Sequence, residues 1–327
     1  MTPRVLTNRA KLRLYAVGMH RRTTLQLAAA LGASLAMNPT LHATGPATPL
    51  SLSALPPLRP SPRMPVLFLG HGSPMNAIED NHWRRSWQAM GQQFGSGPGA
   101  RYPMPQLILC VSAHWLTRGW LVTGMERPAT IHDFGGFPQA LFDINYPAPG
   151  WPAVAEGLSQ VLSQPPVDVD EHQWGLDHGA WAILRPMFPA ATVPVVQLSM
   201  DYSRPPAEHL ALGQQLRGLR EQGVLIVGSG NIVHNLRAMV RTAPDNQGTD
   251  WALEFDAITA RHIRQGNTTE LANFLNLGTL TRAAHPTHDH YLPLLYAAGA
   301  VHDGEPVRFV NEGFQMATIS MRSAVWG

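Results

Sequence analysis

The sequence predicts an α/β fold in which helices cover both faces of a central, largely parallel sheet. The chain has 327 residues, of which 44% are hydrophobic and 14% are charged, and this composition is typical of a globular protein. Short apolar runs rich in Val, Ile and Leu recur along the chain, and amphipathic stretches of helical character separate them. Apolar strands that alternate with helices are typical of parallel sheets buried on both faces.

Residues 1–43 predict an export signal. They contain a basic start, an apolar stretch over 27–37 that is too short to span a bilayer, and the small-residue sequence "LHA". The adjacent Arg21 and Arg22 indicate a twin-arginine signal, so we expect a periplasmic protein without stable membrane insertion after processing. The alternatives are an amphipathic N-terminal helix on a cytoplasmic protein, and translation that starts at Met19.

Residues 44–63 predict an extended linker, because their six prolines remove backbone donors and disfavour both helix and sheet. The catalytic domain is then expected over residues 64–327, where the sequence shows neither an internal repeat nor a second low-complexity break. We interpret this region as one domain.

The elements of this domain follow from its apolar patterning. Strands are predicted where Val, Ile and Leu dominate, at 65–70, 106–113, 192–200 and 223–230. Helices are predicted at 151–163 and 206–222. In such sheets, ligands bind beyond the carboxyl ends of the strands.

Charge and cysteine content exclude several classes of protein. The formal net charge is +2, and the sequence has no block of like charge, so a nucleic-acid partner is not expected. The single cysteine, Cys110, excludes an internal disulfide and any cysteine-rich zinc module. A metal would therefore be held by histidine and carboxylate.

Histidines follow three of the predicted strands. His71 follows "VLFLG", His114 follows "LILCVSA", and His234 comes four residues after "VLIVGSG". Each alone fits a histidine that caps a helix or lies hydrogen-bonded in the core. Together, three imidazoles at the carboxyl ends of parallel strands would meet at one edge of the sheet, which favours a metal site.

Two further segments supply candidate histidines. In "HPTHDHYLPLLYAAG" we select His290, which directly precedes a predicted helix, and we interpret His285 and His288 as loop residues. In "WGLDHGAW", His178 lies between two tryptophans, either as a functional group or as a buried structural histidine bonded to Asp177. The sequence leaves these two interpretations open.

The segment "IHDFGGFP" (131–138) has the glycine pair and aromatic residues of a loop that could cover a flat ligand. His132, Phe134 and Trp115 are therefore candidate substrate contacts, since aromatic rings stack on one another. Each could equally lie in the core.

Six ordered blocks of the sequence resemble the bacterial 4,5-DOPA extradiol dioxygenase family, within the LigB-like class III ring-opening dioxygenases. The blocks are "PVLFLGHGSPMNAIEDN", "VSAHW", "TIHDFGGFPQALFDINYPAPG", "WGLDHGAW", "GNIVHNL" and "HDHYLPLLYAAGA", and the resemblance covers about residues 64–327. The resemblance implies a three-layer α/β domain and an extradiol dioxygenase that opens a catechol ring, such as that of L-DOPA, with O2. The sequence does not identify the catechol or the oligomeric state.

The resemblance also implies a site. A non-haem Fe(II), or Zn(II) as purified, would be surrounded by His71, His114, His234 and His290, with the role of His234 open between ligand and base. His178 would carry protons to and from the substrate, with His234 as the competing candidate, because imidazole titrates near neutral pH.

Two other functions remain open at this point. The same histidines could hold a zinc ion that activates water, which would make the protein a hydrolase. They could also form a non-catalytic metal-binding scaffold, as in Memo-like relatives of the superfamily. Export would suit a protein that folds and binds its metal before crossing the membrane.

Overall fold

The computed structural model describes residue 55 and residues 58–327. The expected signal (1–43) and most of the expected linker (44–63) lie outside the described residues. The end of the linker is anchored to the domain: Leu58 is buried, Ser61 N donates to Glu221 O at 2.9 Å, and Arg63 Nε lies 2.7 Å from a Glu221 carboxylate oxygen. Residues at the end of the predicted linker therefore contact the domain.

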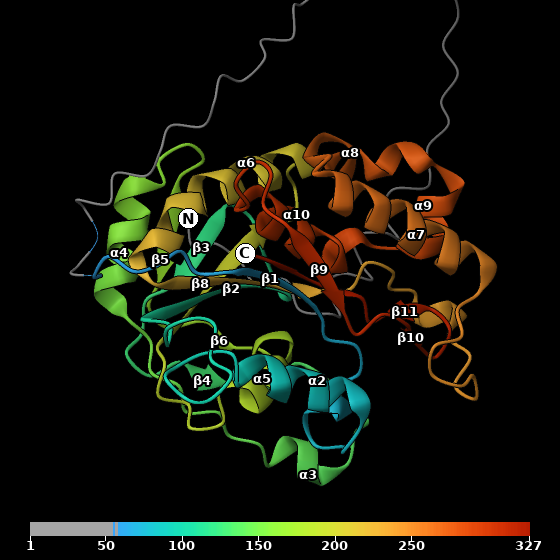
Figure 1. The fold of residues 1–327 in the computed structure, drawn as a ribbon, viewed down its shortest axis with the longest axis horizontal. Coiled ribbons are helices and arrows are strands. Elements are labelled where there is room, and N and C mark those ends of the chain that lie inside the picture. The colour runs from blue at the N-terminus through green and yellow to red at the C-terminus, as the bar shows by residue number, and fades with distance from the viewer. Residues whose placement is uncertain (1–54, 56–57) are drawn as a thin grey trace, which may run out of the picture.

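Across the described residues, eight strands form one mixed sheet in the order β5-β3-β7-β2-β8-β1-β12-β9 (Figure 1). The strands are β1 (Val66–Gly70), β2 (Leu107–Thr117), β3 (Trp120–Thr123), β5 (Val167–Asp170), β7 (Val195–Asp201), β8 (Val224–Gly230), β9 (Val307–Val310) and β12 (Ser323–Trp326).

The four central strands, β7, β2, β8 and β1, run parallel to one another. β12 and β9 add antiparallel pairs at one edge, and β3 joins β7 in antiparallel orientation at the other. Each central strand matches a predicted apolar run, because strands buried on both faces need apolar side chains on both sides. The predicted largely parallel or mixed sheet is confirmed.

Helices cover both faces of this sheet and form three layers (Figure 1). One face packs against α4 (Pro152–Val161), α6 (Pro206–Leu216), α7 (Asp250–Gln265), α8 (Thr268–Ala272), α9 (Thr279–Ala284) and α10 (Leu292–Gly299). The other face packs against α2 (His82–Gly91), α3 (Gln139–Phe142) and α5 (His178–Met187). Within the described ranges, no helix is both long and apolar enough to cross a bilayer.

Short elements make up the rest of the regular structure in the described residues. The 3-10 turns are η2 (Pro74–Ala77), η3 (Arg217–Gln222), η4 (Leu236–Ala238), η5 (Phe274–Leu277) and η6 (His288–His290). Two small strand pairs lie outside the main sheet: β4 (Ala129–Thr130) with β6 (Gly175–Leu176), and β10 (Phe314–Gln315) with β11 (Ile319–Ser320).

The turn after β1 is built around Gly72. Its φ of +60° lies in the left-handed region, and a Cβ there would lie 2.3 Å from the side-chain oxygen of Gln315. The next residue, Ser73, accepts a hydrogen bond from Met75 N and caps η2. The chain therefore turns sharply at Gly72, directly after His71.

The end of β2 differs from the prediction. The strand was expected to stop before His114, but it continues to Thr117. Its pairing with β8 ends at Ser112, whereas its pairing with β7 resumes after a register shift between Val111 and Leu116. His114 lies inside this irregular stretch, because one neighbouring strand ends while the other keeps the backbone extended.

Candidate metal centre

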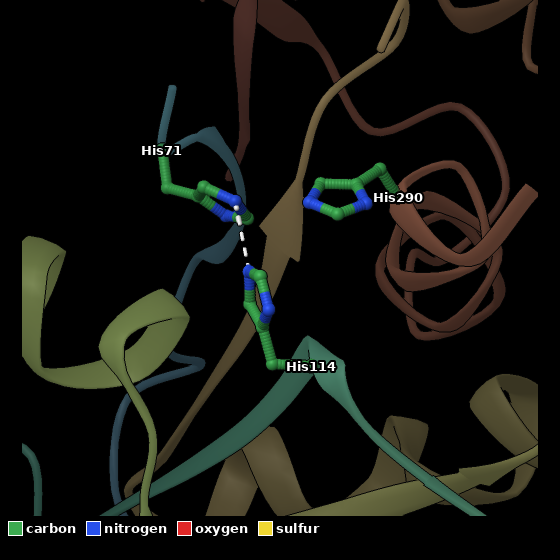
Figure 2. A group of neighbouring side chains, drawn as sticks. All are labelled: His71, His114 and His290. Carbon is green, nitrogen blue, oxygen red and sulfur yellow. Dashed lines mark hydrogen bonds between the residues drawn. The ribbon is translucent and has the colours of Figure 1, made fainter. Parts of the chain in front are cut away.

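Three histidines from three separate elements turn their rings toward one point (Figure 2). His71 follows β1, His114 lies in β2, and His290 ends η6. Their ring centroids are 5.0–5.2 Å apart, and the Nε2 atoms of His71 and His114 are 3.3 Å apart. One nitrogen from each ring lies within 4.8 Å of the others, so among the described residues these three can hold a metal ion together.

The outer nitrogen of each ring is held by a hydrogen bond. The Nδ1 atom of His71 lies 3.0 Å from Ser229 Oγ, whose own hydrogen is donated to the Gly179 carbonyl at 2.5 Å, so Ser229 can only accept from His71. The Nδ1 atoms of His114 and His290 lie 3.1 and 3.0 Å from carboxylate oxygens of Asp133 and Asp289, respectively. Each Nδ1 therefore carries the proton.

These protons leave the Nε2 lone pairs of the neutral rings facing the centre of the cluster. Two unprotonated nitrogens at 3.3 Å, as in His71 and His114, repel each other unless a cation lies between them. Histidine ligands that donate their other N–H to a carboxylate or hydroxyl are typical of metal sites. The donor set therefore fits a divalent transition metal such as iron or zinc.

Burial keeps the His71 ring neutral. The pKa of His71 lies well below the usual histidine value, first because burial disfavours the charged form and then because His114 and His290 would repel a second charge. At neutral pH the Nε2 atom of His71 is therefore free of a proton and available to a metal.

His234 belongs to the same cluster in a different way. Its ring stacks on His290 with centroids 3.5 Å apart and planes inclined by 5°. Burial, followed by repulsion from His290, places its pKa well below the usual value. The main chain holds this position, since His234 N donates to Ala284 O at 3.0 Å and His234 pairs with Ile319 of β11. His234 lies outside the set of three nitrogens that converge within 4.8 Å.

His178 lies beside the three converging histidines, at the first turn of α5. Its ring centroid is 3.9 Å from that of His114 and 5.8 Å from that of His71. Its Nδ1 bonds to Asp133 Oδ1 at 2.9 Å, and not to Asp177 as the structural alternative supposed. Burial, followed by repulsion from His114, lowers its pKa despite the attraction of Asp133.

Asp133 lies in the segment 131–138 but was not predicted as a site residue. Burial alone would raise the pKa of this carboxyl group, but the adjacent His178 and His114 outweigh burial and hold the pKa below its usual range. Asp133 is therefore ionised and accepts from both rings. An acidic residue beside a candidate histidine was the available sequence indication.

The candidate substrate contacts separate into two groups. Phe134 is half-buried, and its ring meets His178 edge-on at 5.4 Å. His132 lies in the same aromatic cluster, 5.8 Å from Phe134, and its Nε2 donates to Ile144 O at 3.0 Å. Trp115 is fully buried and stacks on Trp174 with planes inclined by 2°. Only Phe134 of the three contacts a histidine of the cluster in the described residues.

Two histidines expected in loops have structural surroundings. His285 is buried and donates from Nε2 to the carbonyl of Ile232 at 2.5 Å. His288 is half-buried and stacks on Tyr202 with ring centroids 4.9 Å apart. His285 lies in the loop between α9 and η6, as expected, but this loop packs inward against the segment after β8. His288 begins the 3-10 turn η6.

Gly179 lets the first turn of α5 approach the cluster. A Cβ at this position would lie 2.4 Å from Ser112 Oγ and 2.8 Å from His114 Cδ2. Only a residue without a side chain fits here, because both neighbours are held by other contacts. Sequence spacing gives no indication of this requirement.

Residues 65–327 match the model of the family described as the catalytic LigB subunit of aromatic ring-opening dioxygenase. A 4,5-DOPA dioxygenase extradiol of Escherichia coli K12 is 48% identical over 272 residues, with 82% of this chain and 96% of that protein covered. A protein of the same name from Beta vulgaris is 33% identical, with coverage of 79% and 94%.

Solved structures include a similar fold. The crystal structure of an uncharacterized protein from Escherichia coli K12 superposes with a TM-score of 0.69 and 41% sequence identity, covering 81% of this chain and all of that chain. The three-layer domain, the converging histidines and these matches agree with one another. The chain belongs to the LigB family of aromatic ring-opening dioxygenases.

Proposed function

We propose that this protein is a metal-dependent extradiol dioxygenase that opens the ring of a catechol, L-DOPA or a related diol, with O2. The observation that carries the proposal is the convergence of three Nε2 lone pairs, each fixed by a hydrogen bond at Nδ1, beside a further histidine held in the same way. Relatives named 4,5-DOPA dioxygenase extradiol support the substrate class.

His71, His114 and His290 would hold the metal, Fe(II) in the active enzyme. A ferrous ion bound on one side by three protein ligands keeps open positions at which a diol and O2 can meet. Zn(II) suits the same nitrogen donors and is the ion we expect to compete for the site during purification.

His178 is the group we assign to proton transfer. With Nδ1 bonded to Asp133, its Nε2 can accept the proton of a substrate hydroxyl, and the resulting imidazolium would be stabilised by the carboxylate. The same nitrogen can return that proton to the opened product. His234 remains the competing base, since its ring lies against the ligand His290.

Phe134 would contact the flat face or edge of the substrate. Its ring already lies against His178 and close to Phe137 of the same loop and Phe142 of α3. Such a cluster excludes water from a ring-cleavage site and favours an aromatic ligand over a peptide or ester.

The test is anaerobic loading of the full chain with Fe(II), followed by oxygenated buffer and a panel of catechols beginning with L-DOPA. We expect O2 uptake equal to substrate consumed and a yellow ring-opened product, both lost in His71→Ala and His114→Ala. O2-independent hydrolysis with Zn(II) would instead favour a hydrolase. Tight metal binding without either reaction would favour a non-catalytic scaffold.

We further propose that residues 1–43 direct twin-arginine export, followed by the linker 44–63, so that the enzyme acts in the periplasm. The adjacent Arg21 and Arg22 before an apolar stretch support this proposal. Fractionation tests it: a shortened protein in the periplasm is expected, and a full-length cytoplasmic protein would overturn it.

A further inference from the structure

One carboxylate connects two histidines to which the proposed function gives different tasks. Asp133 Oδ2 lies 3.1 Å from Nδ1 of His114, a proposed metal ligand. Asp133 Oδ1 lies 2.9 Å from Nδ1 of His178, the proposed proton-transfer group, and also accepts the backbone N–H of His178 at 3.0 Å. Both oxygens of the carboxylate are thus engaged by these two residues.

This arrangement determines where the ring protons are. An ionised carboxylate can only accept hydrogen bonds, so the Nδ1 atoms of His114 and His178 must both donate. In the neutral rings, their Nε2 atoms then carry no proton. A neutral histidine in water can carry its proton on either ring nitrogen. Without Asp133, the tautomers of His114 and His178 would therefore not be fixed.

We propose that Asp133 is a positioning residue that fixes the tautomer of a metal ligand and of the proton-transfer histidine at the same time. The roles of His114 and His178 in this inference rest on the proposed function, whereas the tautomers themselves do not. A single substitution at Asp133 would then impair metal binding and proton transfer together.

The segment around Asp133 is anchored on its N-terminal side. Ile131 N donates to Leu176 O at 2.7 Å, and Ile131 O accepts the indole N–H of Trp181 at 2.8 Å. Trp181 belongs to α5, the helix that begins with His178. The carboxylate and the histidine that it orients are therefore held by one rigid element.

The same segment is open on its C-terminal side. Gly135 and Gly136 are exposed, and a Cβ at either position would meet no atom within 4 Å. Asp133 thus lies in the part of the loop that hydrogen bonds anchor. We attribute its fixed position to hydrogen bonds with the histidines and α5, and not to packing of the glycine pair.

The serine beneath His71 offers a matched contrast. Ser229 orients one ligand only: its Oγ lies 3.0 Å from Nδ1 of His71 and donates its own hydrogen to Gly179 O. Replacing Ser229 should change the tautomer of one ring, whereas replacing Asp133 should change two. Asp143, exposed and bonded to Gln139 on the neighbouring helix α3, is a control for the loss of a carboxylate.

The first experiment measures tautomers directly, on the metal-free full chain without substrate. Long-range 15N NMR of histidine-labelled protein distinguishes protonated from bare ring nitrogens, and His114→Gln and His178→Gln variants assign the signals. We expect protonated Nδ1 and bare Nε2 at both residues. A proton on Nε2 together with an unprotonated Nδ1, at either ring in the wild-type protein, would overturn the proposal, whatever the fate of the dioxygenase assignment.

The variants then test whether Asp133 is the cause. In Asp133→Asn one oxygen becomes an N–H donor that faces an Nδ1–H, so at least one of the two rings must change tautomer or lose its bond. We expect altered signals from His114 or His178 in Asp133→Asn, from His71 alone in Ser229→Ala, and from none in Asp143→Asn. Unchanged His114 and His178 signals in Asp133→Asn would contradict the proposal.

Metal affinity supplies an independent measurement. Outer partners of metal-bound histidines typically contribute 10–100-fold to affinity. Competition for Zn(II) with a chromophoric chelator should show a loss of about this size in Asp133→Asn and less than about twofold in Asp143→Asn. Once activity is established, kcat of Asp133→Asn should stay low at saturating metal, because His178 is also misoriented; full recovery by metal alone would contradict the dual role.

Discussion

Replacement of Asp177 by asparagine tests how strongly the fold depends on the carboxylate that precedes His178. Asp177 is fully buried, and its Oδ1 accepts hydrogen bonds from Ser112 Oγ at 2.6 Å and Ala180 N at 3.2 Å. Its Oδ2 accepts from Gln197 Nε2 at 2.8 Å and Trp174 Nε1 at 3.3 Å. The carboxylate thus links β2, β7 and the N-terminus of α5.

The cost follows from the number of donors. In Asp177→Asn an NH2 group replaces one oxygen and faces a pair of donors in either orientation. Gln197 cannot relieve this conflict by turning its amide over, because its Oε1 accepts the Asp177 N–H at 3.1 Å. Two hydrogen bonds to a charged group are lost, at about 1.5–3 kcal/mol each. We therefore expect the free energy of unfolding to fall by about 3–6 kcal/mol.

Urea denaturation of the full chain measures this loss, with Asp143→Asn as the control. Asp143 is exposed, and such substitutions usually change stability by less than about 0.5 kcal/mol. The melting temperature should fall by roughly 10 °C for Asp177→Asn, at about 2–4 °C per kcal/mol. A change below about 1 kcal/mol with an unchanged denaturant slope would refute the reasoning, since it would mean that the four donors do not need an anion.

Three further predictions concern packing, pH and metal. Gly179→Ala should cost about 1–3 kcal/mol of stability and weaken Zn(II) binding, because the new Cβ would overlap two neighbouring side chains. Gly218→Ala is the control and should be neutral or slightly stabilising, because a Cβ there meets no atom within 4 Å. Equal effects of the two substitutions in thermal melts and Zn(II) titrations would contradict this prediction. Glu305 bonds to the fully buried guanidinium of Arg220. Burial alone would raise the pKa of Glu305, but the hydrogen bonds from Arg220 and a backbone N–H lower it. The stability that Glu305 contributes is therefore fully present above the ordinary glutamate pKa of 4.5 and is lost as pH falls through the pKa of the folded state. Glu305→Gln should therefore lower stability at pH 7 by about 3 kcal/mol and flatten its acid dependence, and an unchanged acid limb in urea titrations would argue against it. Zn(II) at about 100 times its dissociation constant should raise the free energy of unfolding by about 2.7 kcal/mol, a gain that a chelator reverses and that His71→Ala lacks; equal stabilisation of that variant would place the ion elsewhere.

The sequence predicted the centre of the fold because that information is local. A strand buried on both faces in a parallel sheet must be apolar throughout, and β1, β2, β7 and β8 carry that pattern in their own residues. The edge strands β9 and β12 were not predicted, since both are short and β12 joins the sheet through β1, which lies far away along the chain. Local pattern is weakest where a strand depends on a distant neighbour.

The sequence also determined which residue types gather at the site. Parallel strands end at the same edge of a sheet, so His71 and His114 were bound to approach each other once the strands were correct. The continuation of β2 past His114 was not predictable, because it depends on β7 staying paired after β8 has ended. The sheet edge at which the histidines meet thus follows from residue pattern, whereas the length of a strand depends on the strands beside it.

Tertiary structure alone decided which nitrogen of each ring faces the centre. That choice depends on acceptors placed by other elements: Ser229 for His71, and Asp133 for both His114 and His178. A hydrogen bond requires an acceptor within about 3 Å in a fixed direction, and spacing along the chain cannot specify such a distance between separate elements. The sequence therefore determined the histidines and the sheet edge that collects them, while the folded packing determined their protonation and orientation.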